Sequence, residues 1–416
     1  MSTPAASPAI TEAGRRRILG AFFVARGSIG VGYLAGFIVL TIAGKELSGH
    51  AELAGWPAAI SMVGRAIGPP PIARAMEVFG RRPAIAGSYA LGAVGAATAA
   101  LAVAAGLFWL LLVGSLLMGV ARAGGDMSRY VAAEIYEPSR RGRAIGIVVW
   151  GGTAGAIGGP LLGGYAQELA GAGGLSPLAG PWFAAAGLLL FSALVTWAFV
   201  RPDPRDVADP TPEAAPADGE PTDLRGVLRD RRVQLGILAI LTGQGVMTLI
   251  MVVIPLHLDS YADLGEAVPV AMTAHVAGMF ALAPLTGRLV DLLGPRPMVL
   301  IGSVLLMLAS ALAAFDAGVG TVLPAMFLLG YGWNACFVAG STMLARGVPL
   351  NVRARIQGRV EVLIGVVGVF SSAASGSLLA FGSGMGWLGA AGLISALLLL
   401  VALGWERSAT RAAAGA

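Results

Sequence analysis

Ionisable side chains lie inside several long apolar stretches of this sequence, where an unpaired charge is costly. Arg26 belongs to the first stretch, while Arg122 and Asp126, four residues apart in the fourth, share one face of a helix. At about 1.5 Å per helical residue, Arg26 lies roughly 12 Å and Asp126 roughly 9 Å from the same membrane surface. We therefore expect Asp126 to pair with Arg26 or with Arg122.

Two roles are open for these three residues. A neighbouring cation favours the charged form of a carboxylate and burial favours the neutral form, so a local rearrangement could load and release a proton at Asp126. Alternatively, Arg26, Arg122 and Asp126 are structural ion pairs that hold the helices together. His275 lies well inside the C-terminal half and suits proton exchange by its reference pKa of about 6.5. The alternative for His275 is a neutral, hydrogen-bonded residue on a packing face.

Two further charges lie nearer the ends of their stretches. Arg65 precedes Gly68 and three prolines, so we expect it to support a kinked helix end rather than to contact substrate. Glu361 is expected to pair with Arg355 or Arg359. No grouping of His, Cys and Asp has metal-ligand spacing, and no Gly-Lys-Ser/Thr phosphate loop occurs, so we expect no metal, no cofactor and no enzyme activity.

The composition indicates that a membrane positions these charges. Of 416 residues, 56% are hydrophobic and 12% are charged, whereas a soluble domain has about 25% charged residues. A transmembrane helix needs roughly 20 apolar residues, and the strict alternation of a membrane β-barrel does not occur. Twelve runs of this length predict an all-α membrane protein, with helices near 18–43, 54–75, 83–105, 108–132, 143–167, 180–200, 233–257, 268–289, 297–316, 320–345, 355–380 and 385–405.

Arginine outside these runs predicts the orientation. It is concentrated in the N-terminal tail, in the connections after the even-numbered runs and in the C-terminal tail, so the positive-inside rule places both termini in the cytoplasm. The basic residues thus indicate topology and not nucleic-acid binding, and the Ala-, Gly- and Arg-rich composition favours a bacterial cytoplasmic membrane. The predicted organisation is a tail (1–17), a six-helix bundle (18–200), a linker (201–232), a second six-helix bundle (233–405) and a tail (406–416).

A charged connection is repeated in the two bundles. Glu77-Val-Phe-Gly80-Arg81-Arg-Pro follows the second run, and Asp291-Leu-Leu-Gly294-Pro-Arg296-Pro follows the eighth. Together with the twelve runs, this repeat resembles the major facilitator superfamily, whose loop motif Gly-x-x-x-Asp-x-x-Gly-x-Arg is matched from Gly287 to Arg296. The first copy differs, with Ala73 at the glycine position and Glu77 at the acid.

The resemblance implies two pseudo-symmetric six-helix bundles and an inner gate. In the superfamily, the acid of the loop motif docks near the cytoplasmic start of a helix in the other half. The alternative is a solvated turn with arginines that set topology. The residues expected at the gate are Glu77, Gly80, Arg81, Gly287, Asp291, Gly294, Arg296 and Glu361.

The fifth run carries a glycine pattern: Gly146-x8-Gly155-x3-Gly159-Pro160-x2-Gly163-Gly164. Its four-residue spacing predicts a bare stripe that lets a neighbouring backbone approach, and Pro160 favours a bend. Simple helix packing explains the stripe. The full pattern also resembles the motif of the drug/proton antiporter branch.

The superfamily resemblance places the first, fourth, seventh and tenth runs around a central cavity. Uncharged side chains from two of these runs are candidates for lining it, since soft and aromatic groups can repack around varied ligands. The alternative is that they are ordinary core or lipid-facing residues. The candidates are Gln244, Met247, Met251, Trp333 and Asn334.

The predicted function is secondary transport by alternating access between two halves. Our leading expectation is proton-coupled export of small amphipathic or drug-like molecules by a monomer in the lipid bilayer. The surplus of intramembrane arginine over carboxylate favours the alternative, a transporter of a small anionic metabolite. A membrane sensor on the same fold, without transport activity, is a third possibility.

Overall fold

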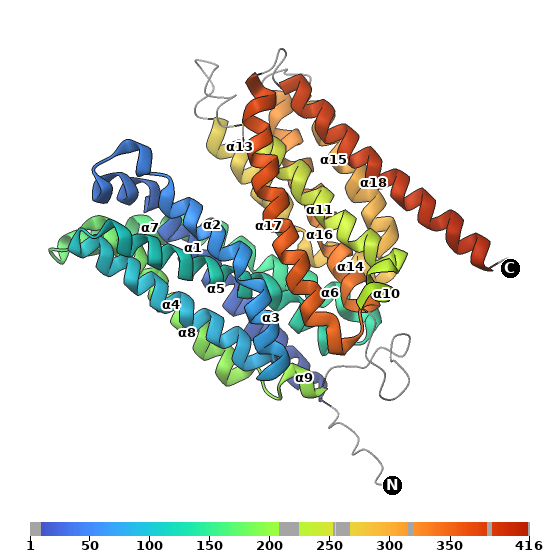
Figure 1. Ribbon diagram of the computed structural model, residues 1–416, viewed down its shortest axis with the longest axis horizontal. Helices are drawn as coiled ribbons and strands as arrows, with labels where there is room; N and C mark the ends of the chain where they lie inside the picture. Colours follow the sequence, from blue (N-terminus) through green and yellow to red (C-terminus); the bar gives the residue numbers. More distant parts are fainter. Residues whose placement is uncertain are drawn as a thin grey trace, which may run out of the picture. The chain divides into compact units, whose positions relative to one another are not determined.

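The computed structural model describes residues 10–207, 224–252, 254, 267–314, 319–380 and 385–414. Every regular element in these ranges is helical (Figure 1). The chain divides into two compact units. Unit 1 comprises residues 1–137, 147–210 and 353–362, and unit 2 comprises residues 138–146, 211–352 and 363–416. Each unit thus includes a short segment from the other half of the sequence.

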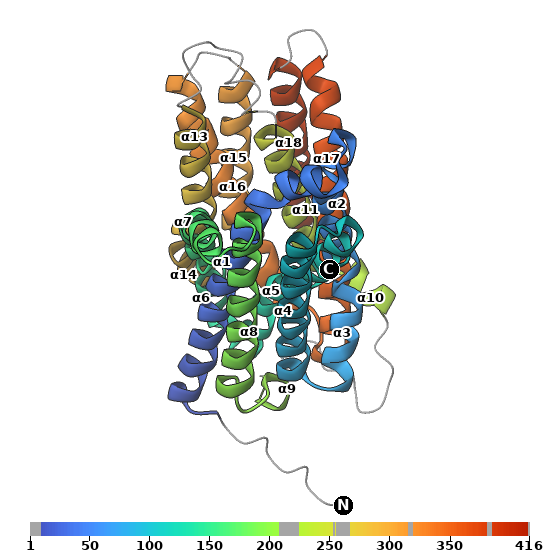
Figure 2. The same ribbon diagram turned by 90° about the vertical axis from the view of Figure 1, so that its left-hand side faces the viewer.

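Unit 1 is built from the N-terminal helices. In it, α4 packs against both α5 and α8, and α1 packs against α7 and α8 (Figure 2). Its helices are α1 (Glu12–Ser48), α2 (Trp56–Ile67), α3 (Pro69–Val78), α4 (Arg81–Ala105), α5 (Phe108–Glu134), α7 (Gly152–Ala172), α8 (Gly180–Phe199) and α9 (Pro204–Val207).

Unit 2 is built from the C-terminal helices. The central helix α16 packs against α11, α13 and α15, and α18 packs against α15. The elements are α10 (Leu224–Arg229), α11 (Arg231–Met251), α13 (Ala267–Val276), the π-helix η5 (Ala277–Ala281), α14 (Ala283–Leu293), α15 (Pro295–Ala314), α16 (Val319–Gly347), α17 (Leu350–Ala380) and α18 (Met385–Ala414). Residues 353–362 of α17 belong to unit 1, and the first residues of α6 (Arg141–Trp150) belong to unit 2.

The described helices match eleven of the twelve predicted spans. Ten helical segments are long and apolar enough to cross a membrane, and a pair bent by 41° around Leu282 makes an eleventh. The predicted run at 54–75 is divided into α2, of 12 residues, and α3, of 10 residues. Three successive prolines without N–H groups follow Gly68, which explains the break. The chain is therefore an all-α, multi-pass membrane protein.

The predicted fifth span differs from expectation in where it is interrupted. The helix α7 continues through Pro160, and the break lies at Gly151, between α6 and α7. At position 151 a Cβ atom would lie 2.9 Å from the Phe23 carbonyl oxygen and 3.2 Å from the Arg26 Cβ. The close approach of α1 therefore accounts for the glycine at the break, whereas the Pro160 ring is on an exposed face.

The predicted glycine stripe of α7 faces α1. A Cβ atom at Gly155 would lie 2.7 Å from the Gly30 carbonyl carbon, and one at Gly159 would lie 2.6 Å from the Leu34 Cβ. Gly163 is close to Ala35, while nothing lies within 4 Å of Gly164. Small residues thus allow α1 and α7 to pack closely, as in other membrane helix pairs.

Candidate functional site

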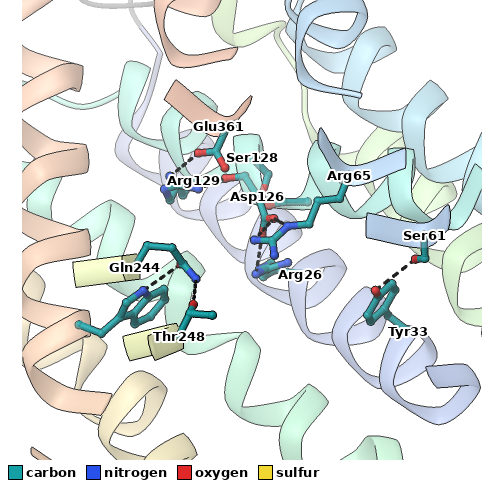
Figure 3. A network of polar contacts seen from close by, with 12 residues as sticks. Arg26, Tyr33, Ser61, Arg65, Asp126, Ser128, Arg129, Gln244, Thr248 and Glu361 are labelled. Atoms are coloured by element: carbon teal, nitrogen blue, oxygen red, sulfur yellow. Dashed lines mark hydrogen bonds and ion pairs between the residues drawn. The ribbon is translucent and has the colours of Figure 1, made fainter. Parts of the chain in front are cut away.

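The centre of the candidate site is Asp126, a buried carboxylate on α5 (Figure 3). Its Oδ1 is 2.9 Å from Nη2 of Arg26 on α1, and its Oδ2 is 3.0 Å from Nη2 of Arg65 on α2. Arg65 Nε also donates to Oδ2, at 3.0 Å. Asp126 therefore pairs with Arg26, one of its two predicted partners, and with Arg65, which the sequence assigned to a helix end.

Arg122, the other predicted partner of Asp126, has an aromatic neighbour instead. Its guanidinium carbon lies 4.7 Å from the centre of the Tyr33 ring, a cation–π arrangement. The Tyr33 hydroxyl is in turn 3.2 Å from Ser61 Oγ on α2. No carboxylate in the described part of the chain forms an ion pair with Arg122. Arg122 is thus held by an aromatic face and not by Asp126.

A second ion pair adjoins this cluster. Arg129, one turn further along α5, donates from Nη2 to Glu361 Oε1 at 2.5 Å and from Nη1 to the Asp126 backbone carbonyl. Its guanidinium also lies over the Tyr130 ring, at 4.2 Å. Glu361 was expected to pair with Arg355 or Arg359. The structure corrects this, because the buried Glu361 meets the equally buried Arg129, and either charge would be costly to bury without a partner.

The cluster around Asp126 has a surplus of positive charge. Three guanidinium groups, those of Arg26, Arg65 and Arg122, surround one carboxylate, while Arg129 and Glu361 balance each other. Nη1 of Arg26 is buried and has no hydrogen-bond partner among the described residues. Such a group is costly to leave unsatisfied, so this arrangement is chemically suited to an additional anionic or carbonyl oxygen ligand.

Unit 2 contains a separate polar and aromatic cluster. Gln244 on α11 donates to Thr248 Oγ1 at 2.9 Å and accepts from the Trp333 indole N–H at 3.2 Å (Figure 3). The Trp333 ring stacks on Phe337, with centroids 4.5 Å apart, and meets Phe280 edge-on. Gln244 and Trp333, two of the cavity candidates, are therefore joined directly.

The other cavity candidates are more deeply packed. Asn334 is fully buried, and its Nδ2 donates to the Met279 carbonyl in η5 at 2.7 Å. Because a π-helix leaves carbonyl groups without their usual partners, this bond stabilises the interruption between α13 and α14. Met247 is buried within unit 2, and Met251 is partly exposed at the end of α11.

His275 lies on a packing face of α13. It is buried, and its Nδ1 donates to the Met326 carbonyl of α16 at 3.1 Å. Its Nε2 is buried without a hydrogen-bond partner in the described residues. No described carboxylate pairs with it. The burial and the hydrogen bond match the packing-face position that the sequence offered as the alternative for His275.

The second loop motif binds the start of α6. Asp291 accepts hydrogen bonds from the backbone N–H groups of Gly142 and Arg143, at 2.9 and 2.8 Å, and from Arg346 Nη2 at 2.8 Å. The motif glycine Gly287 allows this approach, since a Cβ there would lie 3.0 Å from the Arg143 Cα. This is the contact with a helix start from the other half of the sequence that the superfamily resemblance implies.

Two motif residues follow Asp291 in the chain. Gly294, at φ +90°, ends α14, and Arg296 lies in the first turn of α15. The positive φ favours glycine there because a Cβ atom would be strained.

The first loop motif is arranged differently. Glu77 Oε2 pairs with the side chain of Arg355 on α17 at 3.0 Å and with Arg74 at 3.4 Å. Among the described residues, no backbone N–H group donates to the Glu77 carboxylate, and its Oε1 has no hydrogen-bond partner. Because both arginines are substantially exposed, the Glu77 contacts are weaker than those of Asp291.

The neighbouring gate residues form a buried structural cluster. Arg81 pairs with Glu134 on α5, with Nε and Oε2 2.9 Å apart, and both side chains are almost fully buried. Asp203 accepts from the backbone N–H groups of Arg81 and Arg82, at 3.1 and 3.0 Å, and so caps α4. Gly80 has φ +100°, and a Cβ there would lie 2.6 Å from Asp203 Oδ2, so glycine is required.

Comparison with known proteins identifies the family. A profile described as Major Facilitator Superfamily matches residues 18–268 and 260–414. The chain belongs to the Major Facilitator Superfamily. This superfamily member is accordingly a membrane transporter and not an enzyme.

Its relatives leave the transported compound open. It is 31% identical over 388 residues to the uncharacterised MFS-type transporter YdeG of Bacillus subtilis strain 168, covering 91% of this chain and 89% of the relative. It is 28% identical over 346 residues to the riboflavin transporter RfnT of Brucella anthropi, covering 81% and 83%.

Solved superfamily structures share the fold. A bacterial homologue of the iron transporter ferroportin, in an outward-facing state, aligns with a TM-score of 0.71 at 17% identity, covering 94% of this chain and 99% of that one. The human organic anion transporter MFSD10 aligns with a TM-score of 0.70 at 16% identity, with the same coverage. At these identities the likeness concerns the fold alone.

Sequence reasoning missed three residues of this superfamily member's polar network. Arg129 was overlooked although it lies three residues after Asp126, on the same helical face as Arg122 and Asp126. Glu134, at the end of α5, was not considered as a partner for Arg81. Asp203 lies in the predicted linker at 201–232, and nothing in its local sequence indicates that it returns to cap α4.

Proposed function

We propose that this transporter carries small amphipathic organic anions across a bacterial cytoplasmic membrane. The observation that supports this proposal is the cluster of Arg26, Arg65 and Arg122 around the single carboxylate of Asp126. Arginine binds planar anions through two parallel N–H groups, and a surplus of partly buried arginine favours a counter-charge. A bound anion supplies it.

Arg122 is the residue with which to test this proposal. Its cation–π contact with Tyr33 orients the guanidinium and leaves its N–H groups without a described carboxylate. A charge-assisted hydrogen bond contributes about 1.5–3 kcal/mol, so we expect Arg122→Ala to lower kcat/KM for an anion by about 10- to 100-fold. Arg122→Lys, which keeps the charge but not the planar fork, should retain part of the activity.

The measurement is uptake and counterflow in proteoliposomes containing the purified transporter. The probes are labelled benzoate and salicylate as anions, riboflavin because of the relative RfnT, and tetraphenylphosphonium as a cation. Arg16→Ala is a matched control, because the Arg16 side chain is 78% exposed. Transport of the cation with no effect of Arg122→Ala would contradict the proposal, and saturable binding without flux would indicate a sensor.

A second candidate is proton-driven export of drug-like molecules. It is favoured by the glycine and proline pattern of α6 and α7, which resembles that of drug/proton antiporters and in which Gly155 and Gly159 pack against α1. Accumulation of tetraphenylphosphonium against an imposed proton gradient, in the direction opposite to the protons, would support this candidate over anion transport.

A further inference from the structure

The Arg26–Asp126–Arg65 cluster binds its own carboxylate in the way that arginines bind a carboxylate ligand. Arg26 reaches one oxygen of Asp126 at 2.9 Å, and Arg65 reaches the other through both Nε and Nη2 at 3.0 Å. Nη1 of Arg26 remains buried without a partner among the described residues. The two guanidinium groups therefore have more donor capacity than Asp126 uses.

We propose that Asp126 occupies the position of the substrate's anionic group when the site is empty, and that substrate and proton bind together. The anion takes the N–H groups of Arg26 and Arg65, and the displaced carboxylate of Asp126 accepts one proton from the water on the open side. Anion and proton are then released together on the opposite side, and Asp126 again pairs with the arginines. This mechanism rests on the anion transport proposed above.

The exchange is favoured because it keeps the net charge of the buried cluster constant. The empty cluster contains one anionic group, the Asp126 carboxylate; the loaded cluster contains one as well, the substrate. If the anion bound without a proton, a second negative charge would enter an apolar interior, where charge is poorly screened. If Asp126 were protonated without an anion, the arginines would lose their buried counter-ion, which is strongly unfavourable. Both half-loaded states are therefore disfavoured.

Asp126 is the described carboxylate that the arginines Arg26 and Arg65 bind, and the neighbouring titratable side chains have other partners. Glu361 is occupied by Arg129, and the Tyr33 hydroxyl is occupied by Ser61. On α4, Tyr89 is fully buried. The charged and titratable groups around the cluster are Arg26 and Tyr33 from α1, Arg65 from α2, Tyr89 from α4, Arg122 and Arg129 from α5, and Glu361 from α17.

The direction of coupling follows from the exchange. Because anion and proton cross the membrane in the same step, an inward proton gradient drives uptake of the anion. A drug/proton antiporter would couple the two in opposite directions. The direction of anion movement under an inward proton gradient therefore distinguishes the two candidate functions.

The first test uses the unmodified protein. Purified wild-type transporter in weakly buffered detergent solution is titrated with benzoate or salicylate, and proton uptake is recorded with a pH indicator. We expect uptake of about one proton for each anion bound, and an affinity that weakens by about tenfold for each pH unit between about pH 6 and about pH 8, because one proton is bound with each anion. Proton release, or no proton change on binding, would overturn the inference.

The second test uses Asp126→Asn, whose neutral side chain resembles the protonated state. We expect it to bind the anion more tightly than wild type at both about pH 6 and about pH 8, with an affinity that does not change with pH and with no proton uptake. Elution as a monodisperse species in size-exclusion chromatography establishes that it is folded. A folded variant that no longer binds the anion would overturn the inference.

The results of these tests also distinguish the exchange at Asp126 from the anion transport on which it rests. If the wild-type protein binds no anion, the proposal of anion transport is wrong, and so is the exchange at Asp126. If wild type binds anions without taking up protons, anion transport stands and only the exchange is wrong. Should Asp126→Asn fail to fold, the proton stoichiometry of wild type still decides.

Discussion

Two glycines on the same helix, Gly155 and Gly164, have opposite surroundings. Gly155 faces the Gly30 backbone, whereas nothing lies within 4 Å of a Cβ at position 164. Gly155 and Gly164 both belong to the pattern that resembles the antiporter motif. Replacing each glycine by alanine raises the helix propensity in both cases, but only at position 155 does the new methyl group meet another helix.

We predict that Gly155→Ala destabilises the protein and that Gly164→Ala does not. The added methyl group at position 155 would lie 2.7 Å from a backbone carbon that cannot rotate away, and overpacking of this kind costs about 1–3 kcal/mol. Thermal unfolding in detergent measures the effect. Equal melting temperatures for the two variants would mean that α1 and α7 are not in close contact.

The sequence predicted individual charges better than their partners. Arg26 was correctly suggested as a partner of Asp126 because the rise per helical residue places both side chains at a similar depth in the membrane. The sequence did not indicate that Arg65, near the end of α2, also pairs with Asp126. The Arg129–Glu361 pair joins residues 232 positions apart, and a single sequence contains no information on such a pairing.

At the scale of helices, the two loop motifs meet their partners through different groups. Asp291 accepts two backbone N–H groups at the start of α6, together with the Arg346 side chain. Glu77 contacts only side chains among the described residues. A carboxylate at a helix N-terminus contributes about 0.3–1 kcal/mol, and up to about 2 kcal/mol when partly buried.

We therefore predict that Asp291→Asn impairs transport more than Glu77→Gln. Neutralising Asp291 weakens contacts to a helix end, whereas neutralising Glu77 affects pairs with exposed arginines, which contribute little. The expected difference in initial transport rate is up to about thirtyfold, corresponding to about 2 kcal/mol. Rates in proteoliposomes, normalised to reconstituted protein, provide the measurement. The reverse order would show that the first motif is the more important gate.

Element positions were largely predictable, and their interruptions only in part. Apolar run length identified the membrane helices because the bilayer fixes their minimum length. The three prolines after Gly68 indicated a kinked helix end, whereas the run at 54–75 was predicted as one helix and is divided into α2 and α3. The break at Gly151 was not foreseen, because its cause is the nearby backbone and side chain of α1 and not a proline. The π-helix η5 likewise depends on Asn334 from another helix.

For the whole molecule, the arginine distribution leads us to propose that both termini lie in the cytoplasm. Two exposed positions test this proposal: His50, after α1, is predicted outside, and Ser139, between α5 and α6, is predicted inside. The native Cys336 is buried, so background labelling is expected to be low.

We predict that a membrane-impermeant maleimide labels His50→Cys in intact bacterial cells and labels Ser139→Cys only after permeabilisation. The wild-type protein is the control for reaction at Cys336. Labelling in the opposite order would invert the proposed topology, and equal labelling of both variants in intact cells would show that one of the loops is not where the arginines place it.

The missing glycine of the first motif has a counterpart on its partner helix. Gly287 in α14 is small where α6 approaches, but position 73 in α3 is alanine, and there the small residue is Gly358 of α17: a Cβ on it would lie 3.0 Å from the Ala73 Cβ. The space between the helices is thus shared by two positions. Among homologues, residues 73 and 358 should covary, with glycine exchanging sides, so a motif search that demands glycine in the loop alone will overlook functional copies.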